Sequence, residues 1–442
     1  MLSIFRSRIG SSLGRMCLSW PVLLYVYAIY LFCALTIPDI GKMAAGLLLL
    51  MGLVGLRHVK EHFREFTIAE KWLLASYALF SLVSILSFLY WPQTREARMH
   101  LEDYITFMLL LPLYPLLRQR GLRLNWLLVV LSLMAIVLGC VSVAQFVAMK
   151  FFDTSILTTG KVFWLRPSGD VNPMRYGAIS LVVMAFSLSA MLMLRGKGFW
   201  LKLLLAVAVF FALVACLLTQ VRGTWFAIPA LMLIYAIYLY RAGHSRILIV
   251  LLLGGGGGLI GASQTQVLQG RAHLIVANIE AYQQGDSHTS IGSRLDMFKA
   301  AGLLIEQKPI FGHGLNSYSP KATQIRKSTP GMSSQVGVWA NPHNEILQVM
   351  VEKGVIGLIS LLLLFAAPGY LFLQALRGGD DSVVGQQVRF YAMSGLSLLI
   401  VYAVVGQSVA LFEHDVFNHF FALMVLLFAS QIGVAQSVKD RV

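Results

Sequence analysis

The sequence predicts an all-α polytopic membrane protein with about twelve transmembrane helices and one large, partly helical loop outside the membrane. Of its 442 residues, 57% are hydrophobic and only 12% are charged, a balance well beyond that of soluble domains. Apolar stretches long enough to cross a hydrocarbon core of about 30 Å recur along the whole chain. Arginine and lysine gather in the short loops between these stretches, as topology requires of cytoplasmic loops.

The twelve candidate spans are continuous apolar stretches bounded by polar residues. They cover residues 19–37, 42–56, 71–91, 104–117, 125–149, 174–194, 199–218, 223–241, 246–262, 345–373, 389–412 and 418–437. The second and fourth are short for a full crossing, so tilted and re-entrant arrangements stay open for both.

The positive-inside rule orients these spans with both termini in the cytoplasm. Every short loop that this orientation places inside carries basic residues, among them Arg57, Lys60, Arg118, Arg195, Arg241 and Arg377. The net charge of +15 is therefore explained by topology, and we infer no nucleic-acid partner. The chain divides into an N-terminal transmembrane region (1–262), an outer loop domain (263–344) and a C-terminal transmembrane region (345–442).

The outer loop is expected to contain an amphipathic helix at 294–307 that lies on the membrane surface. Ser293 is a candidate N-cap. Helical spacing places four small or apolar residues on one side of this helix, namely Leu295, Phe298, Gly302 and Ile305. The turn-rich segment from Pro309 to Pro320 follows it, since proline and glycine end helices.

A second helix start is predicted at Asn341-Pro342-His343, immediately before the span 345–373. Asn341 can cap the helix and Pro342 suits its first turn, which places His343 in that turn. The positive end of the helix dipole disfavours imidazolium, so a neutral histidine is expected. The residues on the same side of the helix are Leu347, Met350, Gly354 and Gly357, and the glycines form a shallow strip that would admit a helix or a lipid chain.

Six basic residues fall where the positive-inside rule disfavours them, in outer loops or at outer span ends. They are Lys161, Arg166, Arg175, Arg222, Arg271 and Arg294. An anion is their natural partner. The middles of the spans hold almost no ionisable residue, whereas ion-coupled transporters place functional charges there, so a transporter is the weaker hypothesis.

These motifs together resemble the bacterial O-antigen ligase family. His343-Asn344 is followed after nine residues by Gly354-x-x-Gly357, with the spacing of the family signature. The segment Thr219-Gln-Val-Arg222-Gly223 is similar to the family's arginine-glycine segment at the outer end of a span. Arg294 with Pro309-Ile-Phe-Gly312-His-Gly314 is similar to the segment ahead of the histidine.

The resemblance implies a GT-C-like glycosyltransferase of lipopolysaccharide biosynthesis in the bacterial inner membrane. It would transfer polysaccharide from undecaprenyl pyrophosphate to the lipid A-core oligosaccharide at the periplasmic face. His343 would be the base that activates the acceptor hydroxyl, or a phosphate ligand, while Arg222 and Arg294 would stabilise the pyrophosphate that leaves. Arg166, Arg175, Asn344, Gly354 and Gly357 would bind the lipid-linked donor. The expected product has an inverted anomeric centre.

No cofactor is expected, and the four cysteines lie in or beside apolar spans without metal spacing. The outer loops show no Asp-x-Asp, and Asp380-Asp381 is predicted to be cytoplasmic, so we expect a metal-independent enzyme without an obligate protein partner. O-antigen polymerases and protein O-oligosaccharyltransferases share parts of the pattern and stay open, as does, less favoured, a lipid-linked sugar transporter.

Several of the polar residues also have purely structural interpretations. Arg222 and Arg294 could pair with Asp296, Glu345 or Glu352, and Arg166 and Arg175 could anchor the chain at the membrane surface. His313 is favoured as a solvated loop histidine and the 413–415 turn as a polar outer turn. An outer aromatic belt is favoured over sugar stacking for Trp164, Trp225 and Trp339.

Overall fold

The computed structural model describes residues 20–36, 38–55, 63–91, 94–119, 121–151, 167–168, 172–249, 253 and 276–439. Within these ranges the secondary structure is helical, with no β-strand. The helices are α2 (Trp20–Thr36), α3 (Pro38–Gly55), the 3-10 helix η2 (Phe63–Glu65), α5 (Ile68–Tyr90), α6 (Arg95–Leu110), α7 (Leu113–Gln119), α8 (Leu124–Phe151), α9 (Pro173–Met193), α10 (Phe199–Leu218), α11 (Arg222–Trp225), α12 (Ala227–Arg241), α15 (Ser290–Gln307), α16 (Tyr318–Ser328), α17 (Glu345–Gly378), α18 (Val383–Val405) and α19 (Asp415–Lys439).

The predicted class, an all-α polytopic membrane protein, is confirmed, but the count of twelve spans is not. Eight helices of the described ranges are long and apolar enough to cross a membrane. They are α5, α8, α9, α10, α11 with α12, α17, α18 and α19, and each corresponds to a predicted span. The helix α2 is a shorter apolar helix, with its apolar part at Val22–Cys33.

Two predicted spans differ from the structure, and a third cannot be compared. The stretch 104–117 is divided between α6 and α7, because a turn at 111–112 interrupts the helix. The stretch 389–412 ends as a helix at Val405, and the residues up to 414 form turns and loop instead. Most of the stretch 246–262 lies outside the described residues.

The centre of the bundle is formed by α9, α18 and α19, the three spans with the largest buried fractions. Aromatic rings fill it: Phe412 contacts Phe80, Phe107 and Phe421 with ring centroids 5.3–5.7 Å apart. Close backbone approach also contributes, because a Cβ on Gly139 of α8 would lie 2.5 Å from Phe211 of α10. Such packing matters inside a bilayer, where lipid tails remove most of the hydrophobic drive for helix association.

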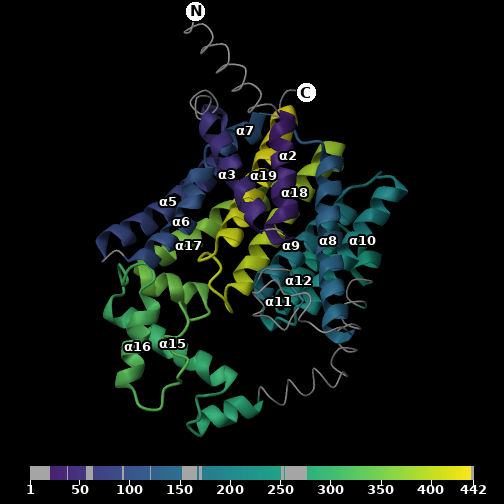
Figure 1. Ribbon diagram of the computed structural model, residues 1–442. Coiled ribbons are helices and arrows are strands. Elements are labelled where there is room, and N and C mark those ends of the chain that lie inside the picture. Colours follow the sequence, from purple (N-terminus) through teal and green to yellow (C-terminus); the bar gives the residue numbers. More distant parts are fainter. Residues whose placement is uncertain are drawn as a thin grey trace, which may run out of the picture.

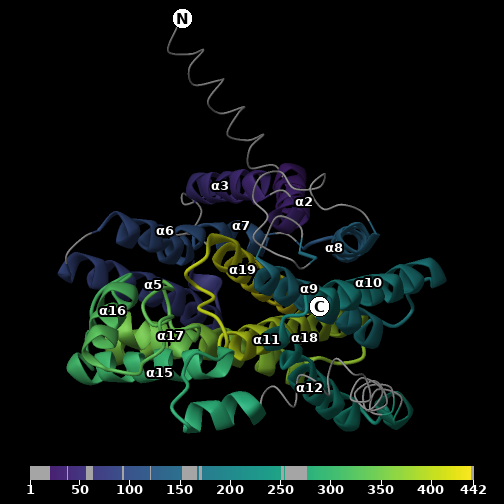
Figure 2. The same ribbon diagram turned by 60° about the horizontal axis from the view of Figure 1, so that its bottom comes forward.

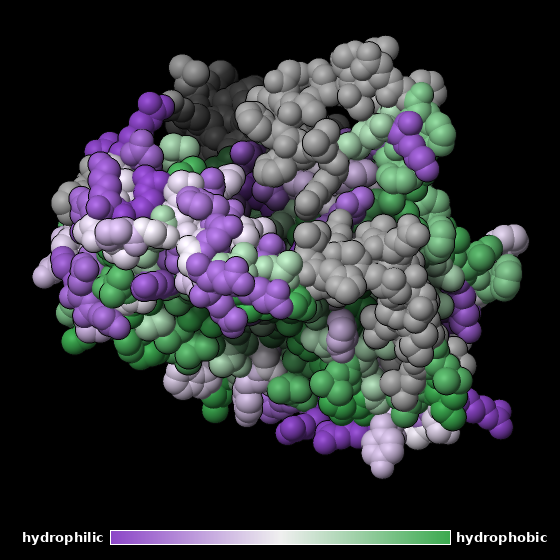
Figure 3. Space-filling view, turned by 90° about the horizontal axis from the view of Figure 1, so that it is seen from below, coloured by the Kyte–Doolittle hydropathy of each residue, from purple (hydrophilic) through white to green (hydrophobic). Residues whose placement is uncertain are grey.

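The loops predicted to be cytoplasmic come together on one side of the bundle. Arg195 contacts both Asp381 and His244, so three loops that are distant in sequence meet there. The helices α15 and α16 lie on the opposite side (Figure 1). Seen from below, that side carries many hydrophilic residues over α15 and α16 (Figure 3). The alternation of loops agrees with the predicted topology, while the assignment of the two sides to cytoplasm and periplasm stays a prediction.

The outer segment has a small hydrophobic core of its own. Met297, Ala300, Ala301 and Leu304 of α15 pack with Tyr318 and Ala322 of α16 and with Val351 of α17. A helix is present over the predicted segment, and the helices α16 and α17 cover the side that holds Met297, Ala301 and Leu304. On the side predicted to face the membrane, Leu295 is exposed and Phe298 is partly buried, and the membrane contact of that side stays a prediction. The N-cap is Thr289 rather than Ser293.

Candidate functional site

The segment around His343 differs from the predicted helix start. Asn344 is the N-cap, accepting the Leu347 amide at 3.1 Å, and α17 begins at Glu345. His343 precedes the helix with φ of 57°, a left-handed conformation that is uncommon outside glycine. The side chain of Asn341 does not cap the helix but accepts the amide of His343 at 3.0 Å. The side chains of Asn341 and Asn344 therefore hold His343 in a turn ahead of the helix instead of in its first turn.

The helix α17 is interrupted at Gly354, and the Pro309–Gly314 loop fills the interruption. Gly354 has φ of 61° and ψ of −157°, so the helical hydrogen bonds on either side are lost. His313 and Gly314 donate their amides to the carbonyl oxygens of Val351 and Glu352 at 2.7 and 2.9 Å. In return the Val355 amide donates to the Pro309 carbonyl at 2.8 Å. Two motifs that are some 40 residues apart in the sequence thus form one structural unit.

The predicted glycine strip is occupied by the protein itself. A side chain on Gly354 would collide with the Ile310 carbonyl, and one on Gly357 would collide with the Lys353 side chain. The sequence predicted an open strip that would admit a lipid chain. Because the protein itself fills this space, the strip is not an open groove. Asn344 likewise has a structural role as the N-cap of α17.

Arg222 begins the short helix α11 beside the turn that follows α18. A Cβ on Gly223 would collide with the Ser408 side chain, so glycine is needed for this close approach. Thr224 anchors the turn by donating its hydroxyl to the Val221 carbonyl at 2.7 Å. The arginine-glycine motif therefore fixes the position of Arg222, whose own side chain is exposed.

The structure brings Arg222, Arg294 and His343 into one electrostatic group. Burial and the positive charge of Arg294 lower the pKa of His343 to about 4. Burial and the positive charge of Arg222 lower the pKa of Arg294. This direction agrees with the neutral state expected for His343, and its causes are burial first and the charge of Arg294 second.

The ion pairs considered for the two arginines are not formed. Asp296 instead accepts the Tyr282 hydroxyl at 3.0 Å and the Ser333 amide at 2.7 Å. Glu345 accepts backbone amides of 411 and 412, and Glu352 accepts the Asn316 amide at 2.7 Å. Among the described residues, neither arginine has a carboxylate within 4.0 Å. Two neighbouring cations without counterions make this a place for an anion.

A buried polar network supports the His343 turn, and the sequence did not reveal it. Asn341 donates to Glu413 at 2.7 Å, and Gln348 donates to both Glu413 and Glu352. Glu413 is 3% exposed, so the carboxylate of the predicted polar outer turn is buried in the protein. Burial, followed by the charges of Glu352 and Glu345, raises its pKa. The only sequence signal was a carboxylate in a short outer loop, too common a feature to single out.

Arg175 belongs to a second electrostatic group, which includes His414 and Asp415 of the 413–415 turn. Its charge, after burial, lowers the pKa of His414 to about 3, together with His100. In that group Asp415 pairs with Lys42 at 2.7 Å. The interactions of Arg175 are with these residues rather than with His343. Arg166 lies outside the described residues, so the structure does not place it.

Other polar residues considered from the sequence have clear positions. His313 is 5% exposed, and its Nε2 lies 2.8 Å from the Leu304 carbonyl, to which it must donate; it is therefore not a solvated loop histidine. The Trp339 ring lies beside His343, with centroids 5.6 Å apart. Trp225 packs against the bundle core, and Trp164 is outside the described residues.

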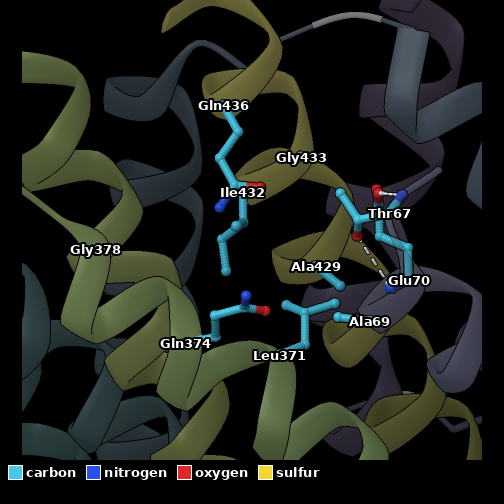
Figure 4. Close-up of a pocket in the computed structure, with 10 residues that line it drawn as sticks. All are labelled: Thr67, Ala69, Glu70, Leu371, Gln374, Gly378, Ala429, Ile432, Gly433 and Gln436. Atoms are coloured by element: carbon cyan, nitrogen blue, oxygen red, sulfur yellow. Dashed lines mark hydrogen bonds between the residues drawn. The ribbon is translucent and has the colours of Figure 1, made fainter. Parts of the chain in front are cut away.

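A cavity of about 270 Å³ opens at the opposite end of the bundle. Its lining comes from α5, α17 and α19, and includes Glu70, Gln374 and Gln436 (Figure 4). Glu70 is already satisfied by Arg118 at 2.8 Å and by the Tyr114 hydroxyl at 2.7 Å. Because no residue of the His343 group lines this cavity, it is separate from the candidate site.

The described part of the chain contains no group of three His, Cys, Asp or Glu side chains that could hold a metal ion. Metal independence itself stays a prediction. What the site offers is a neutral histidine and two arginines at the end of the bundle where α15 and α17 meet α11 and the turn before α19 (Figure 2). The fold defines a polytopic membrane protein, and its candidate site groups a histidine with two arginines that have no carboxylate partner among the described residues.

Comparison with known proteins shows what the central segment of the chain is similar to. The model of the family described as "O-Antigen ligase" matches residues 207–362, a segment that contains Arg222, Arg294, His343, Gly354 and Gly357. The resemblance predicted from the motifs is thereby confirmed over this segment. The chain is also 22% identical over 412 residues to an uncharacterized protein of Haemophilus influenzae, an alignment that covers 91% of this chain and 96% of the relative.

Proposed function

We propose that this protein is an O-antigen ligase. It would transfer a polysaccharide from undecaprenyl pyrophosphate to the lipid A-core oligosaccharide at the periplasmic face of the inner membrane. The single observation that carries the proposal is the electrostatic grouping of His343, Arg294 and Arg222, inside the segment that matches the family.

The chemistry proceeds by one displacement at the anomeric carbon of the donor. The acceptor hydroxyl oxygen forms the new bond as the bond from the anomeric carbon to the pyrophosphate oxygen breaks, and the electron pair leaves with undecaprenyl pyrophosphate. The hydroxyl proton passes to the imidazole of His343, which is neutral at physiological pH and can therefore accept it. Attack opposite the leaving group inverts the anomeric centre.

The arginines balance the charge that grows on the leaving pyrophosphate. Arg222 and Arg294 have no carboxylate partner among the described residues, so their charges remain available for the phosphates. Guanidinium groups beside the leaving phosphates stabilise such charge as it develops. Arg175 and Arg166 stay as proposed contacts for the donor.

Reconstitution tests the reaction. The purified protein in lipid vesicles is supplied with undecaprenyl-linked polysaccharide and lipid A-core, with and without EDTA. We expect capped lipid A-core in both cases and its loss in R222A, R294A and H343A variants that remain folded. Extension of lipid-linked repeats without capping would identify a polymerase. Loss of activity with EDTA that Mg²⁺ restores would overturn the metal-independent mechanism.

A further inference from the structure

The Pro309–Gly314 loop exposes two large apolar side chains that the proposed reaction does not use. Ile310 is 57% exposed and Phe311 is 60% exposed, although the loop backbone is firmly bonded to α17. The residues around these two side chains indicate which kind of environment covers them. The Phe311 ring lies 6.1 Å from that of Tyr90, the last residue of α5, which is itself 72% exposed.

The loop lies at the level where the apolar part of α17 begins. Its carbonyls at Pro309 and Ile310 accept the amides of Val355 and Ile356, just beyond the break at Gly354. From Val355 to Arg377 the helix is about 33 Å long, close to the thickness of the hydrocarbon core. Val355 therefore stands at the hydrocarbon boundary when Arg377 reaches the opposite interface.

The surfaces on both sides of the loop are those of membrane-spanning helices. On α5 the side chains of Leu86 and Leu89 are exposed, and on α17 those of Ile359 and Leu362 are exposed. These faces have the apolar character of lipid-facing helices, and Phe311 joins them through its contact with Tyr90 at the end of α5. Lys308 lies over the Trp91 ring at 3.2 Å, as basic and aromatic residues do in the headgroup region.

We propose that Ile310 and Phe311 form a lipid wedge, a pair of side chains inserted into the acyl region of the leaflet on the side of His343. The wedge fixes the height of α15, and hence of Arg294, relative to the membrane. The backbone hydrogen bonds between this loop and α17 couple the depth of the loop in the membrane to the position of the helix break at Gly354. This inference concerns lipid contact alone and does not depend on the reaction proposed above.

Depth measurement tests the wedge directly. A cysteine-free background receives F311C, I310C or, as a matched control, Q307C at the exposed polar end of α15. Each variant is labelled with an environment-sensitive fluorophore and placed in phospholipid nanodiscs with or without doxyl-labelled phosphatidylcholine. We expect the doxyl lipid to quench positions 310 and 311 several-fold more than position 307, and aqueous iodide to show the reverse order.

Two outcomes would overturn the wedge. Preferential quenching of positions 310 and 311 by iodide would place them in water. Labels shielded from both quenchers would mean that a second copy or another protein covers them. A variant that misfolds is recognised by its loss of a monodisperse gel-filtration peak, and the second wedge position then decides the question.

Discussion

Gly354 and Ile310 are in direct backbone contact: the carbonyl of Ile310 fills the space that the Cβ of any other residue at position 354 would need. The contact joins the loop after α15 to the interrupted turn of α17. Because α15 carries Arg294 and the turn ahead of α17 carries His343, the relative position of the two side chains depends on this junction.

Replacing Gly354 by alanine should destabilise the protein strongly. The new Cβ would meet the Ile310 backbone, and the φ of 61° is unfavourable for any residue with a side chain. Strain and overpacking together predict a loss of about 2–4 kcal/mol in the free energy of unfolding. The matched control is G302A on α15, where a Cβ has open space. Thermal unfolding in detergent measures both, and equal midpoints for the two variants would contradict the role of the junction.

The protonation of His343 should respond to Arg294. The pKa of His343 is lowered to about 4 by burial first and by Arg294 second. Removing the charge in R294Q should raise this pKa toward, but not to, its ordinary value near 6.5. Titration of the imidazole signal in histidine-labelled protein, assigned by its absence in H343N, would show the change. An unchanged midpoint in R294Q would place the two side chains in separate sites.

The same pKa predicts how stability varies with acidity. A histidine whose pKa is lower in the folded state than in the unfolded chain binds fewer protons when folded between about pH 4 and 6.5. The contribution of the neutral His343 to the free energy of unfolding is complete above pH 6.5 and is lost as the pH falls toward 4. The acid-induced fall in melting temperature should therefore be smaller in H343N than in the unmodified protein. A parallel fall in both would mean that other groups dominate acid sensitivity.

H343N also separates the two roles proposed for this residue. Asparagine can still donate a hydrogen bond to phosphate but cannot accept the hydroxyl proton. If His343 is the base, kcat should fall by about 10²–10⁴ while donor binding persists. If it is chiefly a phosphate ligand, donor affinity should fall in H343A and recover in H343N. Binding of a labelled lipid-linked donor and single-turnover transfer measure the two quantities separately.

Replacing Asn341 by aspartate should destabilise the protein at neutral and alkaline pH. Its amide donates to Glu413 and its oxygen accepts the His343 amide. N341D would replace the donor by a second carboxylate next to Glu413, costing about 1–3 kcal/mol. Because protonation of either carboxyl relieves the repulsion, the loss relative to the unmodified protein should be smaller at pH 5 than at pH 8. Melting temperatures at both values test this, and a loss independent of pH would show that charge is not the cause.

Sequence alone determined the class of the protein and most of its spans, and it indicated the three residues that we propose for the site. Those features depend on local properties, since apolar length, loop charge and motif spacing are all visible in one dimension. The same information led to errors at 341–357. A left-handed residue and a broken helix are stabilised by partners elsewhere in the chain, and helical periodicity cannot represent them.

Only the tertiary structure decided what surrounds these residues. It gave Glu413, Gln348 and Asn341 a common buried network, and it filled the glycine strip with the loop after α15. Burial and the approach of Arg294, both long-range effects, set the pKa of His343. The sequence thus named His343, Arg222 and Arg294 through short-range patterns. Their mutual proximity and protonation depend on packing between segments as far apart as Arg222 and His343, which are separated by 121 positions in the sequence, and no local pattern encodes such packing.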